Sequence, residues 1–302
     1  MTLSTPPTWC SNCDGRRCSM TLDRARVVAI LNVTPDSFSD GGAYPTVEAA
    51  VRAAESALDA GAAGLDIGGE STRPGSQPVG AEEQVRRTAP VIAEIRRRLG
   101  DGFVISIDTT LAAVAAAAFD AGSDALNDTS AGRDDPAVLE LVARRGAGLI
   151  LMHRLRLASR DQFSTAYAVA GARGAPEYEG GVVKIVREFL FERAKVAESA
   201  GVLKERIVLD PGLGFGKTVE QNLELIRAAA EFMGLGYPVL SALSRKSFVG
   251  RVSGLRADAP ASERLAGTLA LSVVQYVQGV RLFRVHDVRA HVEALGAAAS
   301  LQ

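Results

Sequence analysis

The chain has no excess charge of either sign. Its 302 residues include 34 lysines and arginines against 35 aspartates and glutamates, which leaves a net charge of -1. A nearly neutral protein has no general electrostatic attraction for nucleic acid, so an anionic ligand must be held by local groups. We therefore expect a small-molecule substrate and no nucleic-acid partner.

Long apolar runs are also missing. The longest uncharged segment, residues 265–280, contains Gly267, Ser272 and two glutamines, and it is shorter than the ~20 apolar residues that cross a membrane. The N-terminus lacks the charged segment and apolar run of a secretory signal. We expect a cytoplasmic protein with no membrane partner.

Cysteine is absent from the body of the chain. Cys10, Cys13 and Cys18 all lie in the first twenty residues. The Cys-x-x-Cys spacing resembles half of a zinc site, but structural zinc takes four ligands and no histidine lies nearby. We predict that residues 1–24 form a flexible tail; a metal shared between two chains and an adventitious disulfide remain alternatives.

The remaining sequence alternates between two periodicities. Short apolar runs predict strands at 27–34, 64–69, 104–109, 125–130, 148–153, 207–210, 238–244 and 281–287. Amphipathic segments predict helices at 47–60, 81–99, 111–121, 136–145, 181–200, 219–231, 262–278 and 288–298. An open doubly wound sheet fits the local pattern too. Eight strand-helix units favour an α/β fold of the (β/α)₈ TIM-barrel type, in one domain over residues 25–302.

Polar residues follow nearly every predicted strand. They are Asn32, Thr72, Arg73, Asp108, Asn127, His153, Asp210, Lys246, Ser247, Arg284 and His286. A single polar residue at such a place is often a helix cap or a turn former. Barrels build their active sites at the carboxyl ends of the strands, so together these residues predict one site on one face. The long irregular segment 154–180 is expected to be a loop on that face.

The strand-end residues fall into two chemical sets. Asp108, Asn127, Asp210 and Lys246 offer acceptors, an amide and a cation, which suit a flat heterocycle with an amino-amidine edge and a carbonyl. Asn32, Thr72, Arg73, Arg284 and His286 suit phosphate oxygens. Asn32 and the acidic loop after it could also hold a hard divalent cation.

Several familiar motifs do not fit. Gly216-Lys217-Thr218 looks like the end of a phosphate-binding P-loop, but Pro211 stands where the first glycine belongs, and Lys217 also breaks the dinucleotide fingerprint. No cysteine lies near the barrel to act as a nucleophile. We interpret His286 as a donor to phosphate, and we expect His291 to be a surface residue.

The motifs LNVTPDSFSDGG, LDIGGESTRPG, SIDT, NDTSAG, LMH, LDPGLGFGKT, LSRKSF and RVHD occur in this order over residues 27–295. Together they resemble those of the dihydropteroate synthases of folate biosynthesis. The resemblance implies that a dihydropterin diphosphate and p-aminobenzoate condense to dihydropteroate with Mg²⁺, in a homodimer. The segment 265–280 is a candidate dimer contact or, alternatively, barrel core.

The resemblance also implies roles for individual residues. Asp108, Asn127, Asp210 and Lys246 would hold the pterin beside Met152. Asn32, Thr72, Arg284 and His286 would bind the diphosphate, with Asn32 also contacting Mg²⁺. Phe38, Asp40, Arg73, Pro74, Phe215 and Ser247 would surround the aminobenzoate. A short helix beginning at Ser247 would present free N–H groups to its carboxylate. We expect a dissociative substitution, with Asp108, Asp210, Lys246, Arg284 and His286 as the catalytic residues.

One segment departs from the family pattern. After strand five the family usually continues MHM-x-G-x-P and later Met-Gln, whereas this chain reads MHRLRLASRDQFSTAY and is longer. Altered loop packing or weaker activity is therefore possible. A catalytically silent paralogue and a pterin-dependent methyltransferase with a corrinoid partner are the alternative functions.

Overall fold

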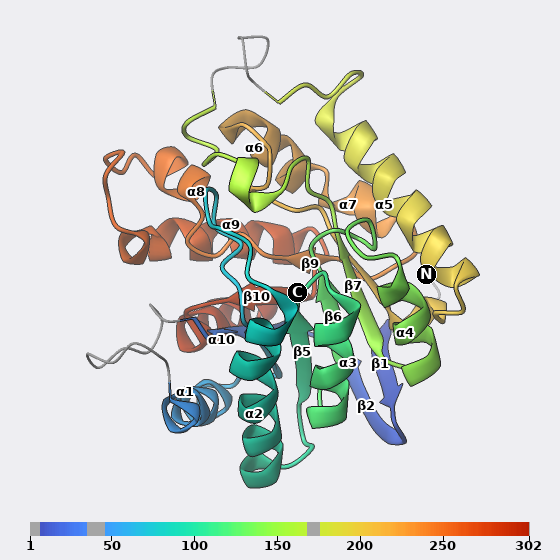
Figure 1. Ribbon diagram of the computed structural model, residues 1–302. Coiled ribbons are helices and arrows are strands. Elements are labelled where there is room, and N and C mark those ends of the chain that lie inside the picture. Colours follow the sequence, from blue (N-terminus) through green and yellow to red (C-terminus); the bar gives the residue numbers. More distant parts are fainter. Residues whose placement is uncertain (1–6, 35–45, 168–175, 302) are drawn as a thin grey trace.

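The computed structural model describes residues 7–34, 46–167 and 176–301, and its centre is a ring of eight parallel strands (Figure 1). They are β3 (Arg26–Asn32), β4 (Gly64–Gly68), β5 (Val104–Asp108), β6 (Ala125–Asp128), β7 (Gly148–Met152), β8 (Ile207–Asp210), β9 (Leu240–Ser241) and β10 (Leu282–Val285). The sheet order is β8-β7-β6-β5-β4-β3-β10-β9. A parallel bridge between Leu209 and Val239 closes the ring. The predicted (β/α)₈ barrel is confirmed.

Helices surround the strands on the outside. They are α1 (Val47–Asp59), α2 (Ala81–Leu99), α3 (Ala112–Ala121), α4 (Ala137–Arg145), α5 (Val182–Ser199), α6 (Val219–Arg227), α7 (Ala229–Met233), α8 (Ser247–Val252), α9 (Leu265–Val277) and α10 (Val288–Ala299). Short 3₁₀ turns are η1 (Ala158–Arg160), η2 (Lys204–Arg206) and η3 (Ala261–Arg264). None of the helices in the described ranges is both long and apolar enough to cross a bilayer.

Local chemistry fixes several of these boundaries. The Thr46 side chain accepts from the N–H of Ala49 and begins α1, and Thr218 with Gln221 forms a reciprocal capping box at α6. The helix predicted at 219–231 is two helices, because Ala228 leaves the helical conformation at φ -89° and ψ 14°. Of the strand predicted at 238–244, only Leu240–Ser241 form β9, and Val239 adds the single bridge to Leu209.

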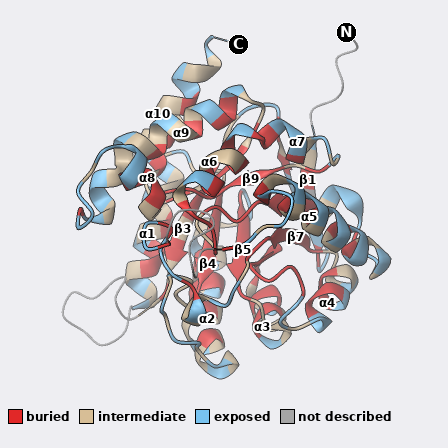
Figure 2. Ribbon diagram, turned by 90° about the horizontal axis from the view of Figure 1, so that it is seen from above, coloured by how far each residue is buried: buried red, intermediate tan, exposed pale blue. Residues whose placement is uncertain are grey.

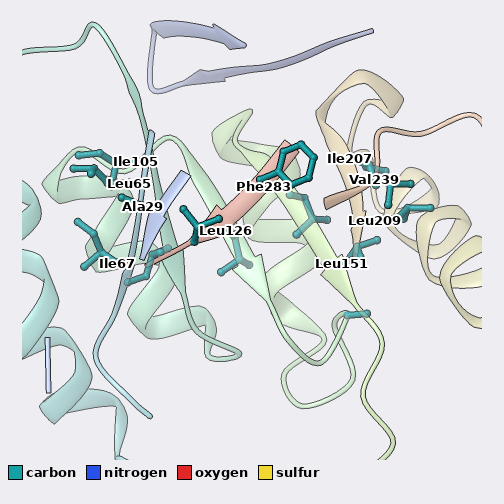
Figure 3. Packing of buried hydrophobic residues seen from close by; sticks show 14 of the residues in the cluster. Ala29, Leu65, Ile67, Ile105, Leu126, Leu151, Ile207, Leu209, Val239 and Phe283 are labelled. Atoms are coloured by element: carbon teal, nitrogen blue, oxygen red, sulfur yellow. The ribbon is translucent and has the colours of Figure 1, made fainter. Parts of the chain in front are cut away.

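The core follows the two-residue alternation of the strands. Outward-facing residues such as Ile105, Leu126 and Phe283 pack beneath the helices in the larger apolar cluster (Figure 3). Buried residues consequently concentrate around the strands and on the inner faces of the helices (Figure 2). Inward-facing residues such as Val104 form a smaller cluster at the base of the barrel. The interior above this base is polar.

The predicted flexible tail is wrong for residues 8–21, which form a β-hairpin. Strands β1 (Thr8–Cys13) and β2 (Arg16–Thr21) are antiparallel, and Asp14 and Gly15 between them both have positive φ, as a two-residue hairpin turn requires. Trp9 is 3% exposed and packs in the cluster at the base of the barrel. Its indole N–H donates to the Arg206 carbonyl over 2.8 Å. The hairpin therefore closes the barrel floor.

The thiols of Cys13 and Cys18 in the hairpin have little reactivity. Cys13 and Cys18 are both free. Burial raises the pKa of Cys13 to about 12 and that of Cys18 to about 11. Both thiols therefore stay protonated near neutral pH, a state in which they are poor nucleophiles and poor metal ligands.

Candidate active site

The carboxyl ends of four adjacent strands bring predicted site residues to one level. Asn32 on β3 pairs with Gly68 on β4, Gly68 with Asp108 on β5, and Asp108 with Asn127 on β6. A methyl group on Gly68 would lie 3.5 Å from Asp108 Cβ and 3.7 Å from Asn32 Oδ1. Glycine at this position therefore keeps the space between Asn32 and Asp108 open.

A guanidinium shared by two carboxylates occupies the middle of the barrel. Arg284 on β10 donates from Nε to Asp66 over 2.5 Å and from Nη2 to Asp108 over 2.7 Å. Asp66, on β4 and 1% exposed, also accepts from Ser106 Oγ over 2.5 Å and from Asn127 Nδ2 over 3.1 Å. This network ties four strands together.

The sequence-based site did not include Asp66. It considered residues at strand ends, and Asp66 lies in the middle of β4. The available signal was a carboxylate in an apolar strand, two residues before Gly68 and therefore on the inward face. A buried charge in such a place needs a partner, and the partner here is Arg284.

The central charges shift each other's protonation. Burial raises the pKa of Asp108, Arg284 opposes this, and the negative charge of Asp66 adds to it. Burial disfavours charge on Arg284, but Asp66 and Asp108 outweigh it and raise the guanidinium pKa above its ordinary value. With two acids for one guanidinium, the site favours a ligand that donates hydrogen bonds to the carboxylates.

The glycine-rich turn after β8 fixes the opposite wall. Asp210 stands beside Met152 in the β7–β8 ladder, and its Oδ1 accepts from the Gly212 N–H over 2.7 Å. Gly212 and Gly214 have φ of 68° and 82°. A side chain at Gly212 would collide with the His153 carbonyl, and one at Gly214 would lie 2.6 Å from Lys246 Cδ. Only glycine permits this tight turn.

The turn places an aromatic ring against a lysine. Lys246 Nζ lies 4.0 Å from the Phe215 ring centroid and donates to the Leu213 carbonyl. Burial lowers the pKa of Lys246 to about 7, with Asp210 and Asp108 opposing and Arg284 adding to the effect. Burial also raises the pKa of Asp210, which Lys246 opposes. Asp210 and Lys246 therefore stabilise each other's charge.

Lys217, which the sequence analysis considered only as part of a failed P-loop, is completely buried. Its Nζ donates to the carbonyls of Gly212 and Phe215 over 2.8 and 2.9 Å and lies 3.0 Å from His153 Nδ1. Burial, with the charge of Lys217 adding, lowers the pKa of His153 to about 2, so Nδ1 is free to accept. Burial lowers the pKa of Lys217 to about 7. The lysine stabilises the turn from inside.

His286 is held as a neutral donor. Ser244 Oγ accepts from the His286 backbone N–H and contacts its Nδ1, both over 3.1 Å. When the serine hydroxyl donates to Nδ1, the ring proton of the neutral imidazole lies on Nε2. Burial lowers the pKa of His286 to about 4, and the charges of Arg284, Arg245 and Arg73 add to this. A neutral imidazole fits the predicted role of a phosphate donor.

The loops after β4 and β9 carry further predicted residues. Thr72, Arg73 and Pro74 lie in a turn that the Ser76 hydroxyl closes by bonding to the Arg73 carbonyl over 2.5 Å. Ser247 is the first residue of α8, as predicted. Phe38 and Asp40 lie outside the described residues.

The predicted surface position of His291 is wrong. It is 0% exposed, and its Nδ1 lies 2.7 Å from the Asp287 carbonyl one helical turn earlier. The helical period turns this side of α10 toward the protein interior.

The metal-binding capacity of the rim is modest. In the described ranges no cluster of three or more His, Cys, Asp or Glu side chains could enclose a cation. Asn32 contributes one amide oxygen at the rim. Mg²⁺ is commonly held by one or two protein oxygens together with substrate phosphates and water. The donor set therefore fits a magnesium ion shared with a phosphorylated substrate.

Comparison with known proteins identifies the family. Residues 28–286 match the family of pterin binding enzymes. A Synechocystis dihydropteroate synthase is 41% identical over 88% of this chain and 86% of its own length. The Xanthomonas albilineans enzyme solved with 4-aminobenzoic acid superposes with a TM-score of 0.85 at 40% identity, covering 99% of both chains. A structure of the X. albilineans enzyme in complex with 7,8-dihydropteroate has a TM-score of 0.81 at 38% identity, over 97% of this chain and 98% of that one. The chain belongs to the dihydropteroate synthases, within the family of pterin binding enzymes.

Proposed function

We propose that this protein condenses 6-hydroxymethyl-7,8-dihydropterin diphosphate with p-aminobenzoate, giving 7,8-dihydropteroate and diphosphate in folate biosynthesis. Family membership supports the reaction. The observation that carries it to this chain is the convergence of Asp108, Asn127, Asp210 and Lys246 around Arg284 on one face of the barrel.

The pterin fits the acidic side of this convergence. Its amino-amidine edge donates hydrogen bonds, and Asp108 and Asp210 are buried carboxylates that accept them. Asn127 is oriented by its bond to Asp66, so its amide oxygen is directed to a ligand donor. Lys246 supplies a donor for the ring carbonyl. Met152, beside Asp210, gives an apolar surface to the flat ring.

The diphosphate fits the opposite side. His286 offers its Nε2 proton, and Asn32 and Thr72 offer uncharged polar groups at the rim. Arg284 does not serve the diphosphate alone, because two of its nitrogens bond to Asp66 and Asp108 on the pterin side. It lies between the two substrate moieties and contributes positive charge to both.

Mg²⁺ bound at Asn32 would neutralise charge that develops on the departing diphosphate. Arg284 and His286 stabilise the same charge by electrostatics and hydrogen bonding. Asp108 and Asp210 stabilise the electron-poor pterin methylene left behind. The arylamine then adds, and it needs no strong base because its conjugate acid is already acidic. The substitution is therefore dissociative.

The aminobenzoate fits the outer rim. Arg73 and Pro74 follow β4, Phe215 follows β8, and Ser247 begins α8 after β9, so all four come from segments at the carboxyl ends of strands. Phe38 and Asp40 complete this set in our proposal. Arg73 supplies a cation, and the Ser247 hydroxyl a donor, for the benzoate carboxylate.

Diphosphate release tests this function. Purified protein is incubated with the dihydropterin diphosphate and Mg²⁺, with and without p-aminobenzoate. We expect release of diphosphate and formation of dihydropteroate that depend on the amine. No turnover would favour the silent paralogue, and methyl transfer to a corrinoid protein without diphosphate release would favour the methyltransferase.

We also propose a cytoplasmic homodimer. α9 buries Thr268, Ser272 and Tyr276 but exposes Val274 and Val277, by 46% and 61%. Val277 belongs to an apolar groove between α9 and α10, which is lined by Val273, Val277, Ala294, Ala297, Ala298 and Leu301. Light scattering should give a dimer for wild type and a monomer for Val277→Glu. A monomeric wild type would exclude the proposal, and cell fractionation checks the compartment.

A further inference from the structure

The segment that departs from the family pattern makes a specific set of contacts with the pterin side of the site. Residues 155–167, which we call the strap, follow β7 and include η1. In Figure 1 the strap lies above the barrel near the start of α6. Leu155 lies against Gly216, where an added side chain would approach Leu155 Cβ to 2.5 Å. The strap therefore covers the turn 211–217.

A buried carboxylate holds the strap to the glycine-rich turn. Asp161 is 6% exposed. Its Oδ2 accepts from the Gly216 N–H over 2.8 Å, and its Oδ1 accepts from the Gln162 N–H over 2.9 Å and from the Tyr167 hydroxyl. One oxygen therefore holds the glycine-rich turn, and the other fixes the carboxylate within the strap.

The same strap also reaches the other substrate loop. The Gly75 N–H, next to Pro74 in the loop after β4, donates to the carbonyl of Ala158 over 2.8 Å. Ala158 and Asp161 belong to one tight turn, in which the Asp161 N–H donates to the Ala158 carbonyl over 3.1 Å. Two residues of the strap, Ala158 and Asp161, thus connect the loop after β4 with the glycine-rich turn after β8.

We infer that Asp161 is a positioning residue of the pterin pocket, which it serves by holding the Gly216 N–H so that Phe215 stays against Lys246. The inference rests on the proposed function, because it assigns Phe215 and Lys246 to the substrate site.

The negative charge of Asp161 has a separate effect. Lys246 is faced by Asp210 on β8, Asp108 on β5 and Asp161 on the strap, which favour its charged form, and by Arg284 on β10 and Lys217 in the glycine-rich turn, which disfavour it. Removing the charge of Asp161 must lower the pKa of Lys246 further. Lys246 then loses its proton at a lower pH, and the alkaline side of the pH profile moves toward acid.

Two substitutions separate these effects. Asp161→Ala removes both the charge and the bond to Gly216, and we expect KM for the dihydropterin diphosphate to rise about tenfold or more, the loss of a hydrogen bond to a charged acceptor. Asp161→Asn keeps an oxygen for the Gly216 N–H when its NH₂ turns toward the Tyr167 oxygen, and it gives up only the bond from the Gln162 N–H within the strap. We expect a KM within about threefold of wild type at pH 7 and a pH profile shifted to lower pH.

The control is Gln162→Ala, which removes an exposed side chain of the same strap and keeps the backbone N–H that donates to Asp161. It should match wild type in KM and pH profile. An active wild type with unchanged KM in Asp161→Ala, or an Asp161→Asn variant with an unshifted profile, would overturn the inference. An inactive wild type would overturn the proposed function instead. If Asp161→Ala does not fold, Asp161→Asn and its pH profile decide the matter.

Discussion

Replacing Asp66 with asparagine should impair catalysis although Asp66 lies beneath the substrate surface. The carboxylate accepts three hydrogen bonds, from Arg284, Ser106 and Asn127. Asparagine keeps the size but carries no charge, and its NH₂ group would face a donor on one side. Arg284 would keep only Asp108 as an ionic partner.

The expected magnitude follows from the bonds that are lost. A hydrogen bond to a charged group contributes about 1.5–3 kcal/mol, and each 1.4 kcal/mol is about a factor of ten. If the misplaced Arg284 weakens binding of the transition state by this free energy, kcat/KM falls by roughly 10- to 150-fold. Thermal unfolding should also occur several degrees lower, because 1 kcal/mol corresponds to about 2–4 °C in domains of 150–250 residues.

Steady-state kinetics with both substrates, together with calorimetry, measures these effects. Ser106→Ala is the matched control, because it removes one neutral donor to Asp66 and leaves the bond between Asp66 and Arg284. It should cost about 1 kcal/mol of stability and alter kcat/KM by less than about threefold. An Asp66→Asn variant with kcat/KM within about twofold of wild type would refute the positioning role of Asp66.

Three further outcomes are expected. Asp210→Asn should lower turnover by more than about threefold, since a neutral amide accepts more weakly from the pterin; turnover within that limit contradicts the assignment. Trp9→Ala should lower the free energy of unfolding by about 3–5 kcal/mol while kcat/KM at low temperature stays near wild type; denaturant unfolding and kinetics check both, and an unchanged stability would contradict the role of the hairpin as barrel floor. His286 titrates near 6.5 when unfolded and at about 4 when folded. The stability due to its neutral form is therefore present above pH 6.5 and is lost as pH falls toward 4. The difference in unfolding free energy between wild type and His286→Asn should become less favourable to wild type over that range, and a constant difference would show that His286 does not titrate in this way.

The hairpin could not be predicted from the periodicity of the sequence. Residues 8–21 have no long apolar run, so composition alone indicated a tail, yet the Asp14-Gly15 pair is a strong local turn signal. What makes the hairpin stable is burial of Trp9 and Met20 against strand residues far along the chain, such as Ile150 and Leu282. No local pattern can reveal such burial.

The sequence by itself determined the barrel and most of the rim. Eight alternations of apolar strand and amphipathic helix leave few other ways to bury both faces of the strands, and parallel strands must bring their carboxyl ends to one side. Asp108, Asn127, Asp210 and Lys246 could therefore be grouped although they are far apart in the chain.

Only the tertiary structure decided how those residues are supported. Asp66 and Arg284 are separated by 218 positions and meet inside the barrel. The Lys217 side chain folds back beneath the glycine-rich turn to which it belongs and bonds to the Gly212 carbonyl. Asp161 bonds to Gly216 in the same turn from a segment that has no periodicity. Buried charges need partners wherever the fold supplies them, and the identity of those partners depends on distances between side chains that no residue pattern specifies.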